Sequence, residues 1–265
     1  MTAPEKRRFP ITLRALQVTA ITDLSPRLRR VTLQGDQLAA FEADGRQHPA
    51  FESPGPDDHI KLFLADPDTG ALSLPVQGDG RLHWPDNPPA LSREYTPRGF
   101  DPASGRLEID FVLHGHGVAG TWAEQVQLGQ VLHLGGPRVS VLLPQADRYL
   151  LIGDETALPA IANWLEMLPS DAQVTAHILI ESPDARIDLR APEAAQINWH
   201  DYDSGDAQAM VRLIDPIPPR GTFIWAGGER AAITALRAHL SGADLDPQQL
   251  DLSNYWTLGQ AAVED

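Results

Sequence analysis

The chain has 265 residues, of which 42% are hydrophobic, and this length suits one large domain or two ordinary ones. Its 21 Lys and Arg residues face 36 Asp and Glu residues, and the net charge of −15 disfavours non-specific binding to nucleic acid or to an anionic membrane surface. The absence of cysteine excludes disulfides, cysteine nucleophiles, thiolate zinc sites and iron–sulfur clusters bound by this chain. The sequence shows neither a signal-peptide pattern nor an apolar run long enough to span a membrane, so we expect a soluble cytoplasmic protein.

The first half of the chain has the pattern of a β domain. Short strand-like runs are separated by turns rich in Gly, Pro and Asp, and several such runs predict a sandwich or a barrel. The predicted strands are 11–21, 28–33, 59–64, 107–113 and 130–134. The segments 34–58 and 75–92 read as long loops, and 119–127 reads as the one clear helix of this half.

The pattern changes near residues 144–147, where we place a domain boundary. Strands and helices then alternate, which predicts a mainly parallel sheet. The predicted strands are 148–153, 174–181, 197–202 and 222–226, with helices at 157–168 and 230–240. In open parallel sheets, ligands bind beyond the carboxyl ends of the strands.

The segment Arg93-Glu94-Tyr95-Thr96-Pro97-Arg98 is the most informative part of the chain. Arginine binds phosphate through two parallel hydrogen bonds, tyrosine covers the face of a flat ring, and a hydroxyl reaches a heteroatom at the edge of that ring. A flavin dinucleotide has all three features, although an ordinary Arg- and Glu-rich strand end is the alternative. A barrel that carries a flavin in front of a parallel sheet would let a nicotinamide meet the flavin at the domain cleft.

A second candidate is the block 110–123, in which a strand leads through a glycine-rich turn into a helix. Glycines let backbone amides approach a ligand closely, and a helix N-terminus favours a diphosphate. His114 and His116 also raise the possibility of a metal, but no third ligand is evident and metal sites need at least three. A helix that merely closes a barrel is the structural alternative.

Weaker signals follow at the strand ends of the second half. The segment 152–161 is a strand–turn–helix start that lacks the G-x-G-x-x-G spacing, and Thr156 is a plausible N-cap. Glu181 could bind a ribose diol and Arg186 could instead meet a 2′-phosphate, so the choice between NADH and NADPH stays open. The sequence has no G-x-S-x-G elbow, H-E-x-x-H motif or P-loop.

These ordered motifs resemble the siderophore-interacting proteins, the FAD-binding ferric-siderophore reductases of the ferredoxin-reductase-like superfamily. The resemblance covers nearly the whole chain. It is carried by 93–98, 110–123, Gly135-Gly136-Pro137-Arg138, 153–160, Gly227-Gly228-Glu229 and Tyr255-Trp256. It implies a six-stranded antiparallel flavin-binding β-barrel over residues 1–145 and an NAD(P)-binding-like α/β domain over residues 146–265.

The resemblance also implies roles for individual residues. Arg93 would bind the FAD diphosphate, Tyr95 would stack on the isoalloxazine and Thr96 would bond near its N5 edge. The full set expected at the cofactor is Arg93, Tyr95, Thr96, Arg98, Asp110, Val112, His114, Gly117, Ala119, Gly120, Thr121 and Trp256. The set expected at the nicotinamide nucleotide is Gly153, Asp154, Thr156, Ala157, Glu181, Gly227 and Glu229.

The family's substrate pocket is basic, and by resemblance Lys61 and Arg138 belong to it. Where relatives often read Tyr-Trp-Arg-x-Gly, this chain has Thr257 in place of the arginine. We therefore expect highly charged ferric tris-catecholates to bind less well than in basic relatives. Replacing Thr257 with arginine should tighten their binding, and an unchanged dissociation constant in an equilibrium titration would contradict this expectation.

The implied mechanism is an electron relay from NAD(P)H through FAD to siderophore-bound Fe(III), with release of Fe(II) and no protein acid, base or metal ligand required. Three alternatives stay open: a general NAD(P)H:flavin or ferric-chelate reductase, a ferredoxin-dependent enzyme, and a non-catalytic flavin- or siderophore-binding protein. We expect a monomer whose partner in iron acquisition is the ferric siderophore.

Overall fold

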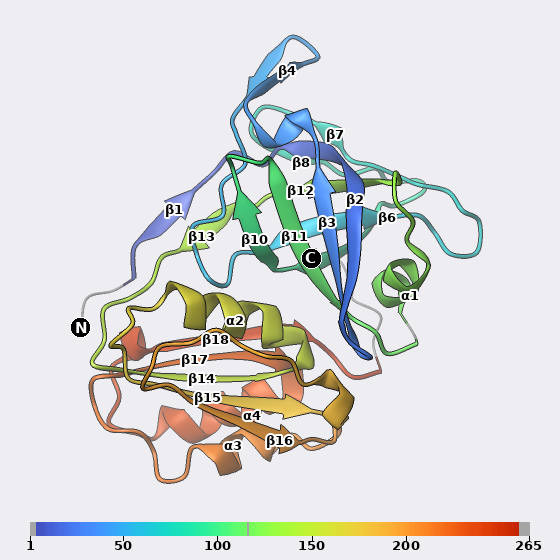
Figure 1. The fold of residues 1–265 in the computed structure, drawn as a ribbon. Coiled ribbons are helices and arrows are strands. Elements are labelled where there is room, and N and C mark those ends of the chain that lie inside the picture. Colours follow the sequence, from blue (N-terminus) through green and yellow to red (C-terminus); the bar gives the residue numbers. More distant parts are fainter. Residues whose placement is uncertain (1–3, 116, 260–265) are drawn as a thin grey trace. The chain divides into compact units, whose positions relative to one another are not determined.

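The computed structural model describes residues 4–115 and 117–259, and its chain forms two compact units (Figure 1). One unit is Lys6–Val141 and the other is built mainly from Leu142 onward. No helix in the described part of the chain is long and apolar enough to cross a lipid bilayer.

The first unit is made of short strands and one α-helix. Its elements are β1 (Lys6–Arg8), β2 (Leu13–Ser25), β3 (Leu28–Gln34), η1 (Asp36–Leu38), β4 (Phe41–Ala43), β5 (Arg46–His48), β6 (Ile60–Leu64), β7 (Val76–Gln77), β8 (Leu82–His83), β9 (Leu91–Tyr95), β10 (Pro97–Asp101), β11 (Arg106–Val112), α1 (Val118–Gln125), β12 (Val131–Gly135) and β13 (Val139–Val141). Seven of the strands form one antiparallel sheet in the order β10-β11-β3-β2-β12-β6-β9.

This order explains why the sheet curls. Strands β9 and β10 lie at opposite edges of the sheet, yet only Thr96 separates them in the sequence. The two edges must therefore meet at Thr96, and the sheet becomes an open barrel. The predicted antiparallel barrel is confirmed, with seven strands in place of six, because the chain breaks at Thr96 and supplies a strand to each edge.

Alternation of side chains fills the barrel. On β11, Leu107, Ile109 and Phe111 are fully buried at every second position, and they share the core with Val31 and Leu33 of β3. Successive side chains of a strand point to opposite faces, so the intervening residues of β11 face away from this core.

Two segments predicted as long loops contain hairpins, and that prediction was wrong in this respect. The pair β4–β5 lies within 34–58 and the pair β7–β8 within 75–92. The first hairpin turns at Asp44 and Gly45, with φ of 51° and 69°. Positive φ at both central residues is the geometry of a tight hairpin turn, and the Asp-Gly pair was the sequence signal for it.

The second unit is a parallel α/β layer. Its elements are β14 (Arg148–Asp154), η2 (Glu155–Ala157), α2 (Leu158–Met167), β15 (Val174–Ile180), η3 (Pro183–Ala185), β16 (Gln196–Asp201), α3 (Ala209–Leu213), β17 (Thr222–Glu229), α4 (Arg230–Ser241), η4 (Pro247–Gln249) and β18 (Leu250–Trp256). All pairings in the sheet β16-β15-β14-β17-β18 are parallel, as predicted.

Helices cover both faces of this sheet. Helix α2 packs on one face, where the Trp164 ring lies 5.6 Å from Phe223 and 6.3 Å from Trp225 (Figure 1). Helices α3 and α4 pack on the other, through buried residues such as Met210 and Ile233. Within this unit the chain first forms the central strand β14 and then adds β15 and β16 on one side of it. It then returns to add β17 and β18 on the other side, so the direction in which strands are added reverses between β14 and β17.

The C-terminal strand β18 was not predicted. The sequence before Tyr255-Trp256 reads as an acid- and proline-rich linker, but a capping box formed by Asp246 and Gln249 begins a short turn there. The buried Gln249 amide also donates to the Thr222 carbonyl oxygen at 2.9 Å. These contacts align the next seven residues with β17 as an edge strand.

A histidine pair on β15 and β16 gives the second unit an expected pH dependence. His177 Nδ1 lies 2.8 Å from His200 Nε2, and burial together with His200 lowers the pKa of His177 from 6.5 to about 4. A depressed pKa means that the stability from neutral His177 is present above pH 6.5 and is lost as the pH falls toward 4.

Replacing His177 with glutamine should therefore reduce the acid loss of stability by about 1–2 kcal/mol, a value lowered because the pair is partly exposed to solvent. Urea unfolding of the wild type and the variant, at neutral pH and near pH 4, measures this difference in the acid loss of stability. Replacing the exposed His83 with glutamine is the control, and an equal acid loss in all three proteins would contradict the assignment.

Candidate functional site

The segment 93–98 lies where the two edges of the barrel sheet meet at Thr96, a place called the barrel seam below. Arg93 and Tyr95 occupy the same face of the edge strand β9, and Thr96 is the single residue between the two sheet edges. Arg93 and Tyr95 are half-buried, whereas Thr96 is only 6% exposed. Arg93 Nη1 donates to the Ser92 carbonyl oxygen at 2.6 Å, which directs the guanidinium back along its own strand.

Aromatic packing connects this seam to helix α1. The Tyr95 ring centroid lies 4.5 Å from Phe111, and Phe111 lies 5.4 Å from Trp122 of α1. The Tyr95 ring therefore packs against the barrel core, while the residue as a whole is half-buried at the edge of the sheet. Burial raises the pKa of Tyr95, so its hydroxyl stays protonated.

The start of α1 has the features expected of a diphosphate site. Gly117 precedes the helix with φ 75°, and no side chain among the described residues caps the helix start. The first backbone N–H groups of a helix have no partner within it, so they are available to an anion. A Cβ on Gly120 would lie 3.2 Å from His114 Cε1, so this glycine lets the histidine ring lie against the first turn.

The remaining predicted cofactor residues of this unit surround these two features. Ala119 is buried in the barrel core, Thr121 is half-buried, and its N–H donates to the Gly117 carbonyl oxygen at 3.0 Å. Val112 is the last residue of β11, directly before the turn that contains His114. His116, considered above as a metal ligand, lies outside the described residues.

Asp110 and Arg98 belong to an ionic network that sequence reasoning missed. Arg30 donates to both Asp110 carboxylate oxygens, at 2.7 and 2.8 Å, and Arg98 Nε lies 4.0 Å from Asp110 Oδ2. Asp110 is only 3% exposed, and Glu108 also contacts Arg30 at 3.3 Å. Arg98 lies at the bulge between Pro97 and Gly99, beside the seam.

The residues of this unit therefore fit FAD. A half-buried arginine, a supported aromatic ring and a hydroxyl residue lie at the seam, and an uncapped glycine-rich helix start is linked to them through Phe111 and Trp122. An isoalloxazine needs the aromatic contact, and a diphosphate needs the guanidinium and the free N–H groups.

The two residues assigned to the substrate lie on neighbouring strand ends of the same unit. Lys61 of β6 is paired with Gly135 of β12, and Arg138 follows Gly135 by three residues. Lys61 Nζ forms an ion pair with Glu94 Oε1 at 3.0 Å and also lies 5.7 Å from the Trp84 ring centroid. Sequence reasoning missed both contacts, because the Lys61–Glu94 contact depends on the register between β6 and β9, and Trp84 lies in a segment predicted as a loop.

The residues predicted at the nicotinamide nucleotide lie at the carboxyl ends of β14, β15 and β17. These include the point between β14 and β17 where the winding reverses, which is where open parallel sheets bind ligands. A Cβ on Gly153 would lie 2.5 Å from Ala157 Cβ, and a Cβ on Gly228 would lie 2.6 Å from Asp154 Oδ2. Glycine at these two positions lets the turn after β14 pack closely against the end of β17.

Asp154 holds this edge of the sheet together. Its carboxylate accepts hydrogen bonds from Thr156 N at 2.9 Å, Thr156 Oγ1 at 2.5 Å, Glu229 N at 3.0 Å and Trp256 Nε1 at 2.8 Å. Burial raises its pKa, and these hydrogen bonds oppose the rise. Trp256, expected at the flavin, is thus fixed to the end of β14, and the half-buried Thr257 follows it.

Two glutamates also order the backbone at this edge of the sheet. Glu229 accepts from Ala231 N, from Ala232 N at 3.2 Å and from Leu258 N at 3.1 Å, so it caps α4 and holds the chain after β18. Glu155 accepts from Glu181 N at 2.8 Å, which orders the end of β15 and leaves Glu181 itself exposed to solvent.

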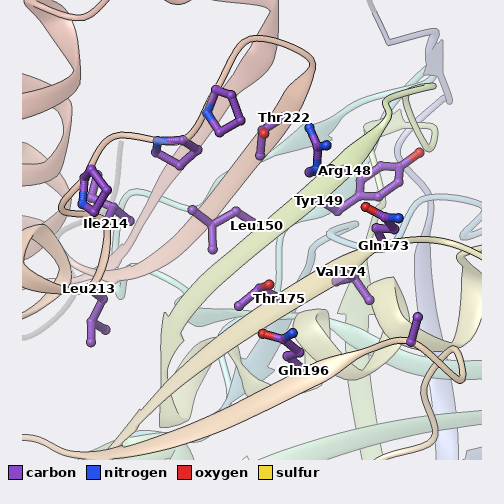
Figure 2. Close-up of a pocket in the computed structure, with 14 residues that line it drawn as sticks. Arg148, Tyr149, Leu150, Gln173, Val174, Thr175, Gln196, Leu213, Ile214 and Thr222 are labelled. Atoms are coloured by element: carbon purple, nitrogen blue, oxygen red, sulfur yellow. The ribbon is translucent and has the colours of Figure 1, made fainter.

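A separate hollow of about 520 Å3 lies at the opposite end of this sheet (Figure 2). Its lining includes Arg148, Gln173, Thr175 and Thr222, which stand at the amino ends of β14, β15 and β17. It is therefore not at the strand ends where parallel sheets bind nucleotides.

Comparison with known sequences gives a consistent result. A profile described as a siderophore-interacting FAD-binding domain matches residues 17–141, and one described as siderophore-interacting protein matches residues 146–259. The chain is 33% identical over 257 residues to an NADPH-dependent ferric-chelate reductase of Escherichia coli, covering 96% of each. It is also 33% identical over 221 residues to a ferric vibriobactin reductase of Vibrio cholerae, covering 81% of this chain and 78% of the relative.

Solved structures are similar as well. A siderophore utilization protein from T. fusca superimposes with a TM-score of 0.87 and 35% identity, over 98% of this chain and 99% of the other. The siderophore-interacting protein SipS from Aeromonas hydrophila superimposes with a TM-score of 0.75 and 29% identity, over 94% and 92% of the two chains.

Proposed function

This chain belongs to the siderophore-interacting protein family, and we propose that it is an FAD-dependent ferric-siderophore reductase that takes its electrons from NAD(P)H. The observation that carries the proposal is the barrel seam. There Arg93, Tyr95 and Thr96 lie in the same unit as the uncapped, glycine-rich start of α1. The names of the Escherichia coli and Vibrio cholerae relatives support ferric chelates as the substrate class.

The residues divide the work of holding the cofactor. Arg93 binds the diphosphate through its guanidinium, together with the N–H groups at the start of α1. Tyr95 covers the isoalloxazine face and Thr96 bonds to its edge. Val112 and His114 line the ribityl and adenine side. Bound FAD supplies the chemistry that neither substrate has alone, since it accepts two electrons together and can pass them on singly.

The overall reaction balances without a protein acid or base. One NAD(P)H is oxidised to NAD(P)+ and releases one proton, and its two electrons reduce two siderophore-bound Fe(III) ions to Fe(II). Fe(II) has a lower charge than Fe(III) and is held more weakly by the siderophore oxygens, so the iron is released. The residues of this chain therefore act by binding and orienting the reactants.

The nicotinamide nucleotide is proposed to bind beyond the carboxyl ends of β14 and β17. Gly153, Thr156 and Gly227 lie at that edge, where Asp154 and Glu229 order the backbone. We expect NADPH to be the better donor, because the Escherichia coli relative is named for it. Arg186, which is exposed five residues after Glu181, is the proposed contact of the 2′-phosphate.

Anaerobic spectroscopy of the purified protein tests the proposal. A flavin absorbance that bleaches on addition of NADPH or NADH, and returns on addition of a ferric siderophore, is the expected result. A flavin that no nicotinamide bleaches would contradict the proposed donor and favour ferredoxin or a binding role. A protein that does not take up FAD would overturn the whole proposal.

We also propose that the enzyme works as a monomer in the cytoplasm, where reduced nicotinamide nucleotides are available. Residues 1–145 would form its FAD-binding domain and residues 146–265 its NAD(P)H-binding domain. The separate profile matches, which end at residue 141 and begin at residue 146, support this division.

A further inference from the structure

The environment of Lys61 differs from that of a free basic residue. Its partner directly across the β6–β9 ladder is Glu94, and the two side chains form an ion pair of 3.0 Å with exposures of 33% and 54%. An ammonium in such a pair presents little net charge to a third group, because the carboxylate beside it contributes the opposite field.

An indole covers the same ammonium from another direction. Lys61 Nζ lies 5.7 Å from the Trp84 ring centroid, and Trp84 is held in place by Phe63, whose ring centroid is 5.6 Å away. Trp84 is nevertheless 42% exposed, which is unusual for a large aromatic side chain. The surface at Lys61 therefore consists of an exposed indole beside an ammonium whose charge is balanced by the Glu94 carboxylate.

We infer that Glu94 and Trp84 set the substrate class of the proposed reductase, which takes ferric chelates of low charge and recognises them by contact with the indole. This inference rests on the proposed function. A ferric ion with three monoanionic hydroxamates is neutral, whereas one with three dianionic catecholates is trianionic. The Lys61–Glu94 pair gives little attraction to the trianion and places the Glu94 carboxylate against it, so the neutral tris-hydroxamate is the favoured ligand.

Binding of redox-inert gallium chelates to the FAD-loaded protein tests the inference without relying on turnover. The probes are a neutral gallium tris-hydroxamate and a trianionic gallium tris-catecholate. The wild-type protein should bind the hydroxamate more tightly. The Glu94→Gln variant, which keeps the side-chain shape, should bind the tris-catecholate about ten-fold more tightly than the wild type and the hydroxamate within about two-fold of it.

Two further variants separate local from general effects. Asp244→Asn removes one negative charge from an exposed ion pair with Arg220, in the other unit of the chain, and should leave both dissociation constants unchanged. Trp84→Ala should weaken hydroxamate binding by about five-fold or more, because it removes the aromatic contact. Circular dichroism of each variant verifies that it is folded.

Different results would contradict the inference about Glu94 and Trp84 and the proposed reductase function. If Glu94→Gln shifts both chelates equally, shifts neither, or is matched by Asp244→Asn, the inference about Glu94 fails while the reductase function stands. Equal hydroxamate binding by Trp84→Ala and wild type would remove the role given to the indole. If the wild-type protein binds neither chelate and NAD(P)H does not bleach its flavin, the proposed function itself fails.

Discussion

Replacing Arg93 with alanine is expected to weaken FAD binding by about a hundred-fold, because a bidentate, charge-assisted contact with the diphosphate is lost. Arg93 is half-buried at the barrel seam. Titration of the flavin-free protein with FAD, followed by flavin fluorescence, gives the two dissociation constants. Arg93→Lys should fall between them, since lysine keeps the charge but cannot form the two parallel bonds.

The matched control for this result is Arg106→Ala. Arg106 lies on β11 in the same unit, its side chain is 52% exposed, and its Nε is 3.6 Å from Glu108. Surface ion pairs of this kind contribute little, so this variant should bind FAD as the wild type does. An Arg93→Ala protein that retains FAD as tightly as the Arg106→Ala control would show that the diphosphate is held elsewhere.

The second large effect is expected at Asp154. Alanine at this position should lower the free energy of unfolding of the second unit by about 2–4 kcal/mol, because it leaves the buried N–H of Glu229 and the half-buried indole N–H of Trp256 without an acceptor. Part of the loss is offset, since burying the carboxylate is itself costly. Hydrogen exchange of the backbone amides of β14 and β17, recorded under native conditions, measures this change in the free energy of unfolding.

Asp206→Ala provides the comparison. Asp206 accepts from the backbone N–H of Gln208, two residues on, at 3.0 Å, just as Asp154 accepts from Thr156, but Asp206 lies at the surface. The loss at Asp206 should stay at about 1 kcal/mol, because it removes one hydrogen bond near the surface and an exposed ion pair with Arg212, each of which contributes little. Equal losses at the two positions would mean that the contacts of Asp154 with β17 and Trp256 add nothing.

Local pattern was enough to predict most of the fold. The alternation along β11 and the strand–helix order after residue 147 follow from the spacing of apolar residues, which can be read from a short stretch of sequence. Strand β18 was missed because its seven residues are ordered by Gln249 and β17, and no local signal reports those contacts. The extra barrel strand was missed for a similar reason, since only the sheet order reveals that Thr96 joins two edges.

The candidate site was predictable in its residues but not in their pairing. Arg93, Tyr95 and the glycines before α1 could be read as motifs because each motif is contiguous. The contacts of Lys61 with Glu94, and of Asp110 with Arg30, depend on the register between strands far apart in the sequence. Asp154 and Glu229 were predicted as nucleotide contacts, and the structure shows the hydrogen bonds through which both order the backbone; their contact with the nucleotide stays a prediction.

The pairing of β1 with β13 has a further consequence. Lys6 lies opposite Val141, and Leu142 N donates to the Glu5 carbonyl oxygen at 2.9 Å, so the barrel unit begins and ends at one place. A segment whose two ends are adjacent can be spliced into a loop of another protein without stretching either junction. The barrel unit of this chain therefore has the geometry needed to be inserted, as one continuous segment, into a loop of another protein.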